Sequence, residues 1–167
     1  MKRRPRLTRA RLRELLRYDP QTGEFRWRKR SGARYGPPGA PASRHQDARY
    51  IRIDGRAYTE HQLAWFYVTG RWGRPTIDHR DGDVTNNRWN NLRRATVSQN
   101  NANRRRPRNN TSGYKGVYRA SKPGQWCAQI GVNGRMKHLG TFSAPQAAHA
   151  AYVAAARKYY GEFARAQ

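Results

Sequence analysis

Acidic residues are scarce in this chain. Ten Asp and Glu stand against 35 Lys and Arg among 167 residues, which gives a formal net charge of +25 and a pI near 11.5. This balance favours a polyanionic partner, with nucleic acid as the first choice and an anionic membrane surface or a large ribonucleoprotein as alternatives. Three of the ten acids, Asp78, Asp81 and Asp83, fall within six positions. Such a cluster is unexpected in so basic a chain, so its presence has to be explained separately.

Cysteine and long apolar runs are also nearly absent. The single cysteine, Cys127, allows no internal disulfide and no cysteine-based zinc site, which fits a reducing cytoplasm. The best apolar run, Leu63 to Val68, has six residues, far fewer than the roughly 20 of a membrane span. The basic residues 1–6 have no apolar stretch behind them, so we expect neither a signal peptide nor a membrane partner.

Hydrophobic residues make up only 36% of the chain. This share favours small modules joined by basic linkers over one large core. We predict four regions: an N-terminal basic helix and hairpin region at 1–57, a central module at 58–104, a basic linker at 105–112, and a second module at 113–164.

The N-terminal region alternates short apolar patterns with turn residues. In chain order, the pattern predicts an amphipathic helix from Thr8 that uses Leu12, Leu15 and Leu16, a turn at 18–23, a strand with Phe25 and Trp27, a Gly- and Pro-rich loop at 31–48, and a tight hairpin around Asp54-Gly55.

A second helix should follow that hairpin. Thr59 and Gln62 have the spacing of a capping box, and the helix should end at Gly70. His61 lies in its first turn. Taken alone, we interpret it as a core or capping histidine rather than a catalytic one.

The central stretch joins an acidic pair to a polar loop. Asp78 and His79 end a short β-branched stretch, and the loop runs from Arg80 to Asn87. A carboxylate beside a neutral imidazole suits a hard divalent cation and a general base. Thr96 with Gln99 forms another capping box, which predicts a helix that begins near Val97 and carries Asn100 in its first turn.

The last module has strand patterns followed by an Ala-rich helix. Strands are predicted at 116–119, 126–130 and 135–139, with Asn133-Gly134 as a hairpin turn and residues 140–142 closing the sheet. Ser143 with Gln146 should cap the helix, whose small-residue stripe lets it lie close to the sheet. That stripe comprises Ala147, Ala148, Ala151, Tyr152, Ala155 and Tyr159.

One sheet face should stay free of the helix and be positively charged. Its expected side chains are Arg119, Arg135, Lys137 and, depending on register, either Trp126 or the neighbouring Gln residues. A basic sheet face can enter the DNA major groove. Arg104, Arg105 and Arg106 in the preceding basic stretch would neutralise phosphates and make binding salt-dependent. For the sheet face and for the basic stretch alike, the alternative is a basic surface that is only solvated and contacts no DNA.

Two families resemble parts of this chain. The segments Thr59–Trp65, Ile77–Asp83 and Asn87–Thr96, together with Asn100, closely resemble phage and intron-encoded HNH homing endonucleases. The unit 113–164 resembles the plant ethylene-response-type (APETALA-type) DNA-binding domain. That second resemblance is carried by Gly113-Tyr114-Lys115-Gly116-Val117, Leu139-Gly140-Thr141-Phe142 and the Ala-rich helix with Tyr152.

The resemblance implies an α+β fold: a ββα-metal (HNH) nuclease module, followed by a small three-stranded antiparallel sheet with one packed helix. By position it implies that His79 is the general base, that Asp78 and Asn100 are metal ligands, and that Asn91 holds the loop and orients His79. Asn101 or Asn103 could replace Asn100 if the helix register differs. Asn87 or Asn90 could likewise replace Asn91.

These inferences predict a metal-dependent DNA endonuclease that hydrolyses a phosphodiester bond. Oxygen donors from Asp78 and Asn100 suit one Mg²⁺ or Mn²⁺ ion. The expected partner is double-stranded DNA, with no small-molecule substrate. A monomer with one metal site favours nicking over double-strand cleavage. We expect a cytoplasmic protein, acting in a bacterial host cell if phage-encoded.

Two alternatives come from other classes of protein. A non-catalytic, sequence-specific DNA-binding regulator would share the basic sheet module but would not need Asp78, His79, Asn91 and Asn100 together in register. A ribosome- or RNA-associated basic protein would explain the net charge but not the acidic cluster.

Overall fold

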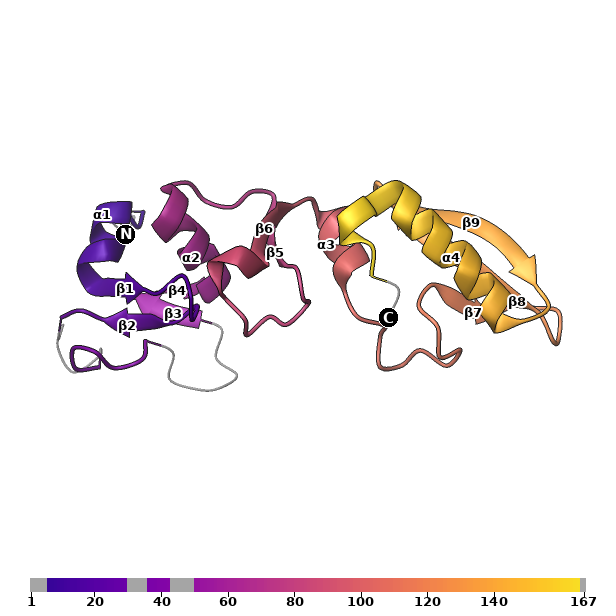
Figure 1. Cartoon of the computed structure of the whole chain (residues 1–167), viewed down its shortest axis with the longest axis horizontal. Coiled ribbons are helices and arrows are strands. Elements are labelled where there is room, and N and C mark those ends of the chain that lie inside the picture. The colour runs from indigo at the N-terminus through magenta and orange to yellow at the C-terminus, as the bar shows by residue number, and fades with distance from the viewer. Residues whose placement is uncertain (1–5, 30–35, 43–49, 166–167) are drawn as a thin grey trace. The chain divides into compact units, whose positions relative to one another are not determined.

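The computed structural model describes residues 6–29, 36–42 and 50–165 (Figure 1). The chain divides into two compact units, Met1–Arg94 and Ala95–Gln167. Both mix helices with small antiparallel sheets. Within the described ranges, no helix is long and apolar enough to cross a membrane.

The first unit begins with a helix and a short hairpin. Helix α1 (Arg9–Leu15) starts where predicted, because the Thr8 side chain accepts a hydrogen bond from the Arg11 N–H. Strands β1 (Leu16–Tyr18) and β2 (Phe25–Trp27) pair in antiparallel fashion across the 18–23 turn. Of the loop predicted at 31–48, residues 31–35 and 43–48 lie outside the described residues. Backbone hydrogen bonds join Gly39, Ala40 and Ala42 to β2.

The next hairpin and helix are close to the sequence prediction. Strands β3 (Tyr50–Ile53) and β4 (Arg56–Thr59) pair through Asp54 and Gly55, which both have positive φ. Helix α2 (Glu60–Thr69) ends at a left-handed Gly70. The predicted Thr59 capping box is wrong: the Thr59 hydroxyl makes no capping bond and contacts the His61 ring instead.

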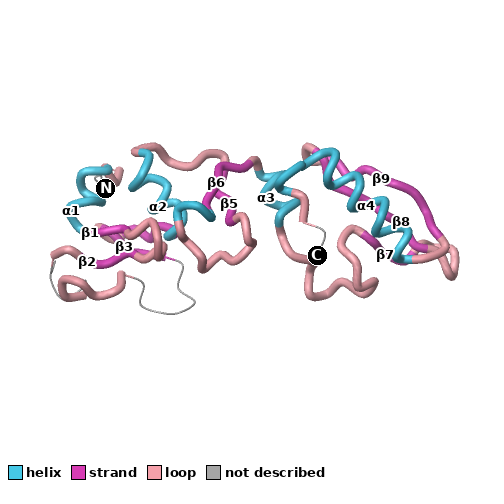
Figure 2. The backbone as a smooth tube through the Cα atoms, viewed as in Figure 1, coloured by secondary structure: helices cyan, strands magenta, loops and turns pink. Residues whose placement is uncertain are grey.

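The end of the first unit carries the polar loop. Strand β5 (Thr76–His79) pairs with β6 (Leu92–Ala95), and a short 3₁₀ turn, η1 (Trp89–Asn91), leads into β6. The loop of residues 80–88 between them is drawn pink in Figure 2. A single apolar core supports the α1, α2 and β1–β6 elements. Its largest fully buried side chains are Leu12, Leu15, Leu16, Ile51, Ile53 and Leu63.

The second unit begins with helix α3 (Val97–Asn103). The predicted capping box is confirmed, with Thr96 and Gln99 exchanging side-chain-to-backbone hydrogen bonds. Ala102 of α3 packs with Tyr160 and Phe163 at the end of the unit. This helix therefore shares a core with the C-terminal elements of the chain.

Three antiparallel strands follow in the order β7-β8-β9: β7 (Val117–Arg119), β8 (Trp126–Val132) and β9 (Arg135–Phe142). Asn133 and Gly134 form the predicted turn, both with positive φ. The pairing of β8 with β9 shifts register between Ala128 and Gln129 and continues to Phe142. Strand β9 therefore includes residues 140–142 and is longer than the predicted 135–139.

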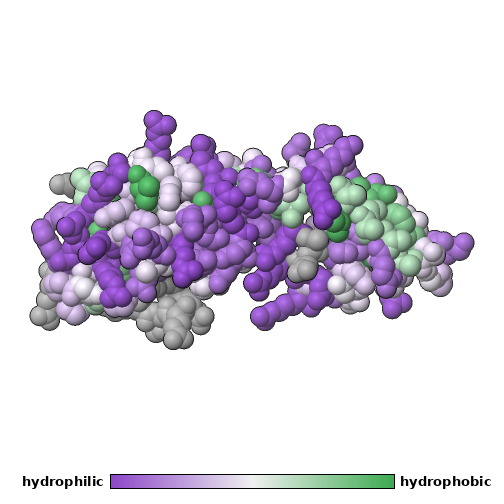
Figure 3. Space-filling model, viewed as in Figure 1, coloured by the Kyte–Doolittle hydropathy of each residue, from purple (hydrophilic) through white to green (hydrophobic). Residues whose placement is uncertain are grey.

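Helix α4 (Pro145–Tyr160) covers one face of this sheet. The predicted Ser143 cap is wrong, because Pro145 takes the first helical position and Ala144 becomes the N-cap. The buried stripe repeats every four residues, at Ala148, Tyr152, Ala156 and Tyr160, whereas Ala147 and Tyr159 are exposed. The view in Figure 3 is mostly hydrophilic, with a hydrophobic area over α4.

Candidate active site

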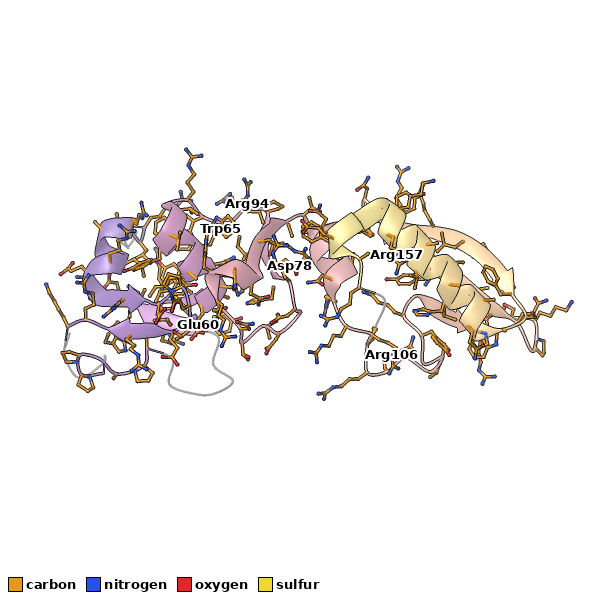
Figure 4. All side chains as sticks on the ribbon, viewed as in Figure 1. Glu60, Trp65, Asp78, Arg94, Arg106 and Arg157 are labelled. Carbon is orange, nitrogen blue, oxygen red and sulfur yellow. The ribbon has the colours of Figure 1, made fainter. Side chains whose placement is uncertain are left out.

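Strand β5 ends in two buried polar side chains. Asp78 is 3% exposed and His79 is 5% exposed. The Nε atom of Arg93, on β6, lies 2.8 Å from Oδ2 of Asp78, and both side chains are almost fully buried. Burying either charge alone would be costly, so each makes the other tolerable inside the protein. Figure 4 labels Asp78 on β5.

His79 is held by an amide whose orientation is determined by a carboxylate. Nδ2 of Asn87 lies 2.9 Å from Oε2 of Glu60, and a carboxylate can only accept this bond. The other amide atom, Oδ1 of Asn87, lies 3.0 Å from Nε2 of His79. Because an amide oxygen can only accept, Nε2 of His79 must carry the hydrogen. In the neutral ring, the lone pair then resides on Nδ1.

Elements distant in sequence bring these groups together. Glu60, labelled in Figure 4, is the first residue of α2. His79 is the last residue of β5, and Asn87 lies in the 80–88 loop. The His61 ring packs edge-on against the His79 ring, with centroids 5.2 Å apart. The sequence did not indicate that these two histidines would be neighbours.

Asn91 holds the loop. Its Oδ1 accepts from the Asp81 N–H at 3.1 Å, and its Nδ2 donates to Oδ1 of Asp81 and to the Asn86 carbonyl at 3.0 and 2.7 Å. The amide that bonds the His79 ring belongs to Asn87, one of the two alternatives left open by the sequence. A catalytic role for Asn91 stays a prediction.

The acidic cluster is explained in part by the same loop. Asp81 and Asp83 accept backbone N–H bonds from the residues two positions ahead, at 2.8 and 2.9 Å. Burial acts to raise the pKa of Asp81, but donors from Asp83, Asn91 and Asn86 outweigh it and hold that pKa below its usual value. Asp81 and Asp83 therefore shape the loop, and Asp78 differs from them in its burial.

The two predicted metal ligands fall in different units. Asp78 belongs to the first, and Asn100, half-buried on α3, belongs to the second. Their pairing therefore stays a prediction. Near Asn100 on the same helix, Asn101 is exposed and Asn103 is buried. Over the described ranges, no three His, Cys, Asp or Glu side chains gather as a group that could hold a metal ion.

The basic sheet residues lie on the other face from the one predicted. Paired residues share a face, and β9 pairs Lys137 with the buried Ile130 and Arg135 with Val132. The Lys137 ammonium accordingly lies 5.1 Å from the ring centroid of Tyr159 on α4. The expectation of a free basic face is wrong for these side chains, because the tight Asn133-Gly134 turn sets the pairing.

Arg119 and Trp126 are likewise paired, on the face that carries α4. The Arg119 guanidinium lies 5.1 Å from the Trp126 ring centroid and stays exposed. The face turned away from the helix carries Tyr118, Cys127, Gln129, Met136, His138 and Thr141. Whether any of these residues contacts DNA stays a prediction, as it does for the exposed Arg104, Arg105 and Arg106.

The second unit buries a cation, Lys115, whose burial the sequence did not indicate. The Lys115 ammonium donates to the backbone carbonyls of Ala102, Arg104 and Arg165 at 2.5, 2.6 and 3.2 Å. Burial, with Arg165 and Arg104 nearby, lowers the pKa of Lys115 to about 8. Lys115 thus ties the end of α3 and the C-terminal segment to the start of the sheet.

Comparison with known protein families finds a match that includes the 80–88 loop. Residues 58–102 match a protein-family model described as HNH endonuclease. The matched stretch begins at β4, includes α2, β5, the 80–88 loop and β6, and ends within α3. No curated protein matches the chain. An HNH endonuclease domain therefore occupies residues 58–102, and this domain type implies a DNA-cleaving hydrolase.

Proposed function

We propose, with that domain as the premise, that the chain is a metal-dependent DNA endonuclease in which His79 is the general base. The observation that carries the proposal is the bond between Asn87 and His79, inside the matched stretch. This bond holds the ring in one tautomer, and the lone pair on Nδ1 can then take a proton from water. Attack of that water on phosphorus would break the phosphodiester bond.

The donor chemistry fits a hard cation. Asp78 would supply a carboxylate oxygen and Asn100 an amide oxygen, with no sulfur ligand, which suits Mg²⁺ or Mn²⁺. Arg93 already bonds Oδ2 of Asp78, so the guanidinium and the cation would share this carboxylate. When bound, the cation would stabilise negative charge on the scissile phosphate and on the departing 3′ oxygen. Asn91, through Asp81 and Asn86, would keep the loop in shape around the site.

The remaining features support a DNA partner. The net charge is +25, and the second unit has the three strands and packed helix expected of the plant-type DNA-binding domain. We propose that this unit binds double-stranded DNA and that Arg104, Arg105 and Arg106 contact phosphates. The protein would act as a monomer of phage or homing type and nick one strand in the cytoplasm of its host.

Cleavage of supercoiled plasmid tests the proposal. Wild type should nick the plasmid in Mg²⁺ or Mn²⁺ and stop when EDTA is added. Asp78→Ala, checked by thermal unfolding because it leaves Arg93 buried without this carboxylate, should abolish nicking but keep DNA affinity. Asp54→Asn, which removes an exposed acid and suits the positive φ of that turn, should nick like wild type. DNA binding without nicking under any of these conditions would instead identify a non-catalytic regulator. Equal nicking by Asp78→Ala and wild type would overturn the metal assignment.

A further inference from the structure

The turn at residues 18–23 is packed against the backbone of Asn87. The hydroxyl of Tyr18, buried in the core, donates to the Asn87 carbonyl at 2.6 Å. Two residues beyond Asn87, the Trp89 N–H donates to the Pro20 carbonyl at 3.0 Å. The turn thus bonds the end of the polar loop and the start of η1, on either side of Arg88.

Gly23 brings the same turn into close contact with the loop. Its φ is +79°, and a Cβ added there would lie 2.5 Å from the carbonyl carbon of Asn87. No real Cβ comes that close to backbone, so only glycine allows this approach. Gly39 has a similar φ of +82° but meets nothing within 4 Å. The close packing, rather than the backbone conformation alone, therefore distinguishes Gly23.

The side chain of Asn87 is held as firmly as its backbone. It is 3% exposed and bridges Oε2 of Glu60 and Nε2 of His79. Without an acceptor at Glu60, the amide could rotate and present Nδ2 to the ring. The ring nitrogen Nε2 would then have to accept, and the hydrogen would move to Nδ1.

We propose that the 18–23 turn and Glu60 are a clamp that positions His79 through Asn87. The turn fixes the Asn87 backbone, Glu60 fixes its amide, and the amide oxygen selects the Nε2–H tautomer. The inference rests on the proposed function, because it leaves the lone pair of the general base on Nδ1. It assigns the N-terminal hairpin a role in the chemistry of the 58–102 domain, with Tyr18, Gly23, Glu60 and Asn87 as positioning residues.

Glu60 variants test the side-chain half of the clamp. Glu60→Ala should move His79 toward the Nδ1–H tautomer, seen in its ring ¹⁵N chemical shifts, with His79→Ala used to assign the signals. The same variant should lower kcat for nicking by about 10- to 100-fold at nearly unchanged KM. Glu60→Gln keeps an acceptor and should restore both the tautomer and most of the rate.

Two matched pairs test the backbone half. Gly23→Ala should lower kcat and disturb the His79 tautomer, while Gly39→Ala should do neither. Tyr18→Phe should lower kcat by roughly two- to tenfold, while Tyr50→Phe, at an exposed tyrosine, should not. Thermal unfolding of each variant shows whether it is folded. Tyr18→Phe adds no atoms, so we expect it to fold even if Gly23→Ala does not. In that case Tyr18→Phe alone tests the backbone half of the clamp.

The NMR arm separates this inference from the proposed function. If wild type never nicks DNA, the nuclease proposal fails, while the ¹⁵N shifts still decide whether the clamp selects the tautomer. A shifted tautomer in Glu60→Ala and in Gly23→Ala or Tyr18→Phe supports the clamp. An unchanged Nε2–H tautomer in Glu60→Ala and in the folded turn variants overturns it.

Discussion

The two units bury their cations in different ways. In the first, the Arg93 guanidinium faces the Asp78 carboxylate at 2.8 Å. In the second, the Lys115 ammonium donates to three backbone carbonyls. Backbone oxygens are present in every sequence, so the Lys115 arrangement needs only a pocket of the right shape. A buried carboxylate needs a charged partner as well, which Arg93 supplies to Asp78.

The two units also differ in the number of polar side chains that they bury. Within the described ranges, the first unit buries five between residues 78 and 93, and the second buries two. Each such group costs free energy unless it is hydrogen-bonded. The five are Asp78, His79, Asn87, Asn91 and Arg93, and they surround the proposed site. The second unit, with Asn103 and Lys115, is held mainly by its apolar helix–sheet contact.

The largest effect on stability should come from breaking the buried ion pair. Arg93→Met leaves Asp78 buried beside an apolar side chain and should lower the free energy of unfolding by about 3–5 kcal/mol. Adding Asp78→Asn should recover part of that loss, because the uncompensated charge is then removed. Urea unfolding of the two variants measures both. Equal stability of Arg93→Met and wild type would show that the pair does not support the fold.

Lys115→Met should cost less. The substitution leaves the carbonyls of Ala102, Arg104 and Arg165 without their donor, a loss of about 1–3 kcal/mol in the second unit only. Hydrogen exchange of α4 amides should quicken, while that of α2 amides should stay as in wild type. Faster exchange in α2 to the same extent would mean that the two units do not unfold separately.

The pH dependence of the second unit should be smaller still. Burial, with Arg165 and Arg104 nearby, lowers the pKa of Lys115 from 10.5 to about 8. The folded unit therefore releases this proton first. Between about pH 8 and pH 10.5, the unfolded chain binds more protons, so stability should rise with pH. After correction for intrinsic rates, hydrogen exchange of the α4 amides should slow between about pH 8 and pH 10.5 in wild type. It should not slow in Lys115→Met. A flat wild-type profile would contradict it.

The exposed basic residues of β9 should have the smallest effect on stability and should act on DNA binding instead. Arg135→Gln or Lys137→Gln should weaken DNA binding, by about 1–3 kcal/mol at one base position if the side chain reads a base. A uniform loss across sequences, with a shallower salt dependence, would make it a phosphate contact. Unchanged binding would assign recognition to the opposite face, which carries Gln129 and His138.

Much of the local structure could be predicted because it depends on residues adjacent in sequence. Asp54-Gly55 and Asn133-Gly134 tolerate positive φ, and both made the predicted turns. The Thr96 capping box held, whereas the one at Ser143 failed because Pro145 determines where α4 begins. The capping box at Thr59 failed as well, because its hydroxyl bonds the His61 ring. A capping signal therefore holds only where no nearby residue competes for the side chain or for the first helical position.

The arrangement around the site depends on distant contacts, which the sequence does not display. Asn86, Asn87, Asn90 and Asn91 are alike as residues, and only the turn at 18–23 and Glu60 distinguish Asn87. The two-residue turn Asn133-Gly134 pairs Val132 with Arg135 and therefore Ile130 with Lys137. The sheet face that carries Lys137 could thus have been predicted from the sequence by counting residues back from the turn. The burial of Lys115 could not be predicted from the sequence, because its partners are backbone carbonyls.

The most direct measurement is single-turnover nicking of supercoiled DNA by His79→Ala beside His61→Ala, in Mg²⁺ at saturating protein. A general base contributes about 10²–10⁴-fold, so His79→Ala should lose that much rate while its DNA affinity stays unchanged. His61→Ala, which removes only the neighbouring ring, should lose far less. Wild-type rates in His79→Ala would contradict the account and leave a basic protein that binds DNA without this chemistry.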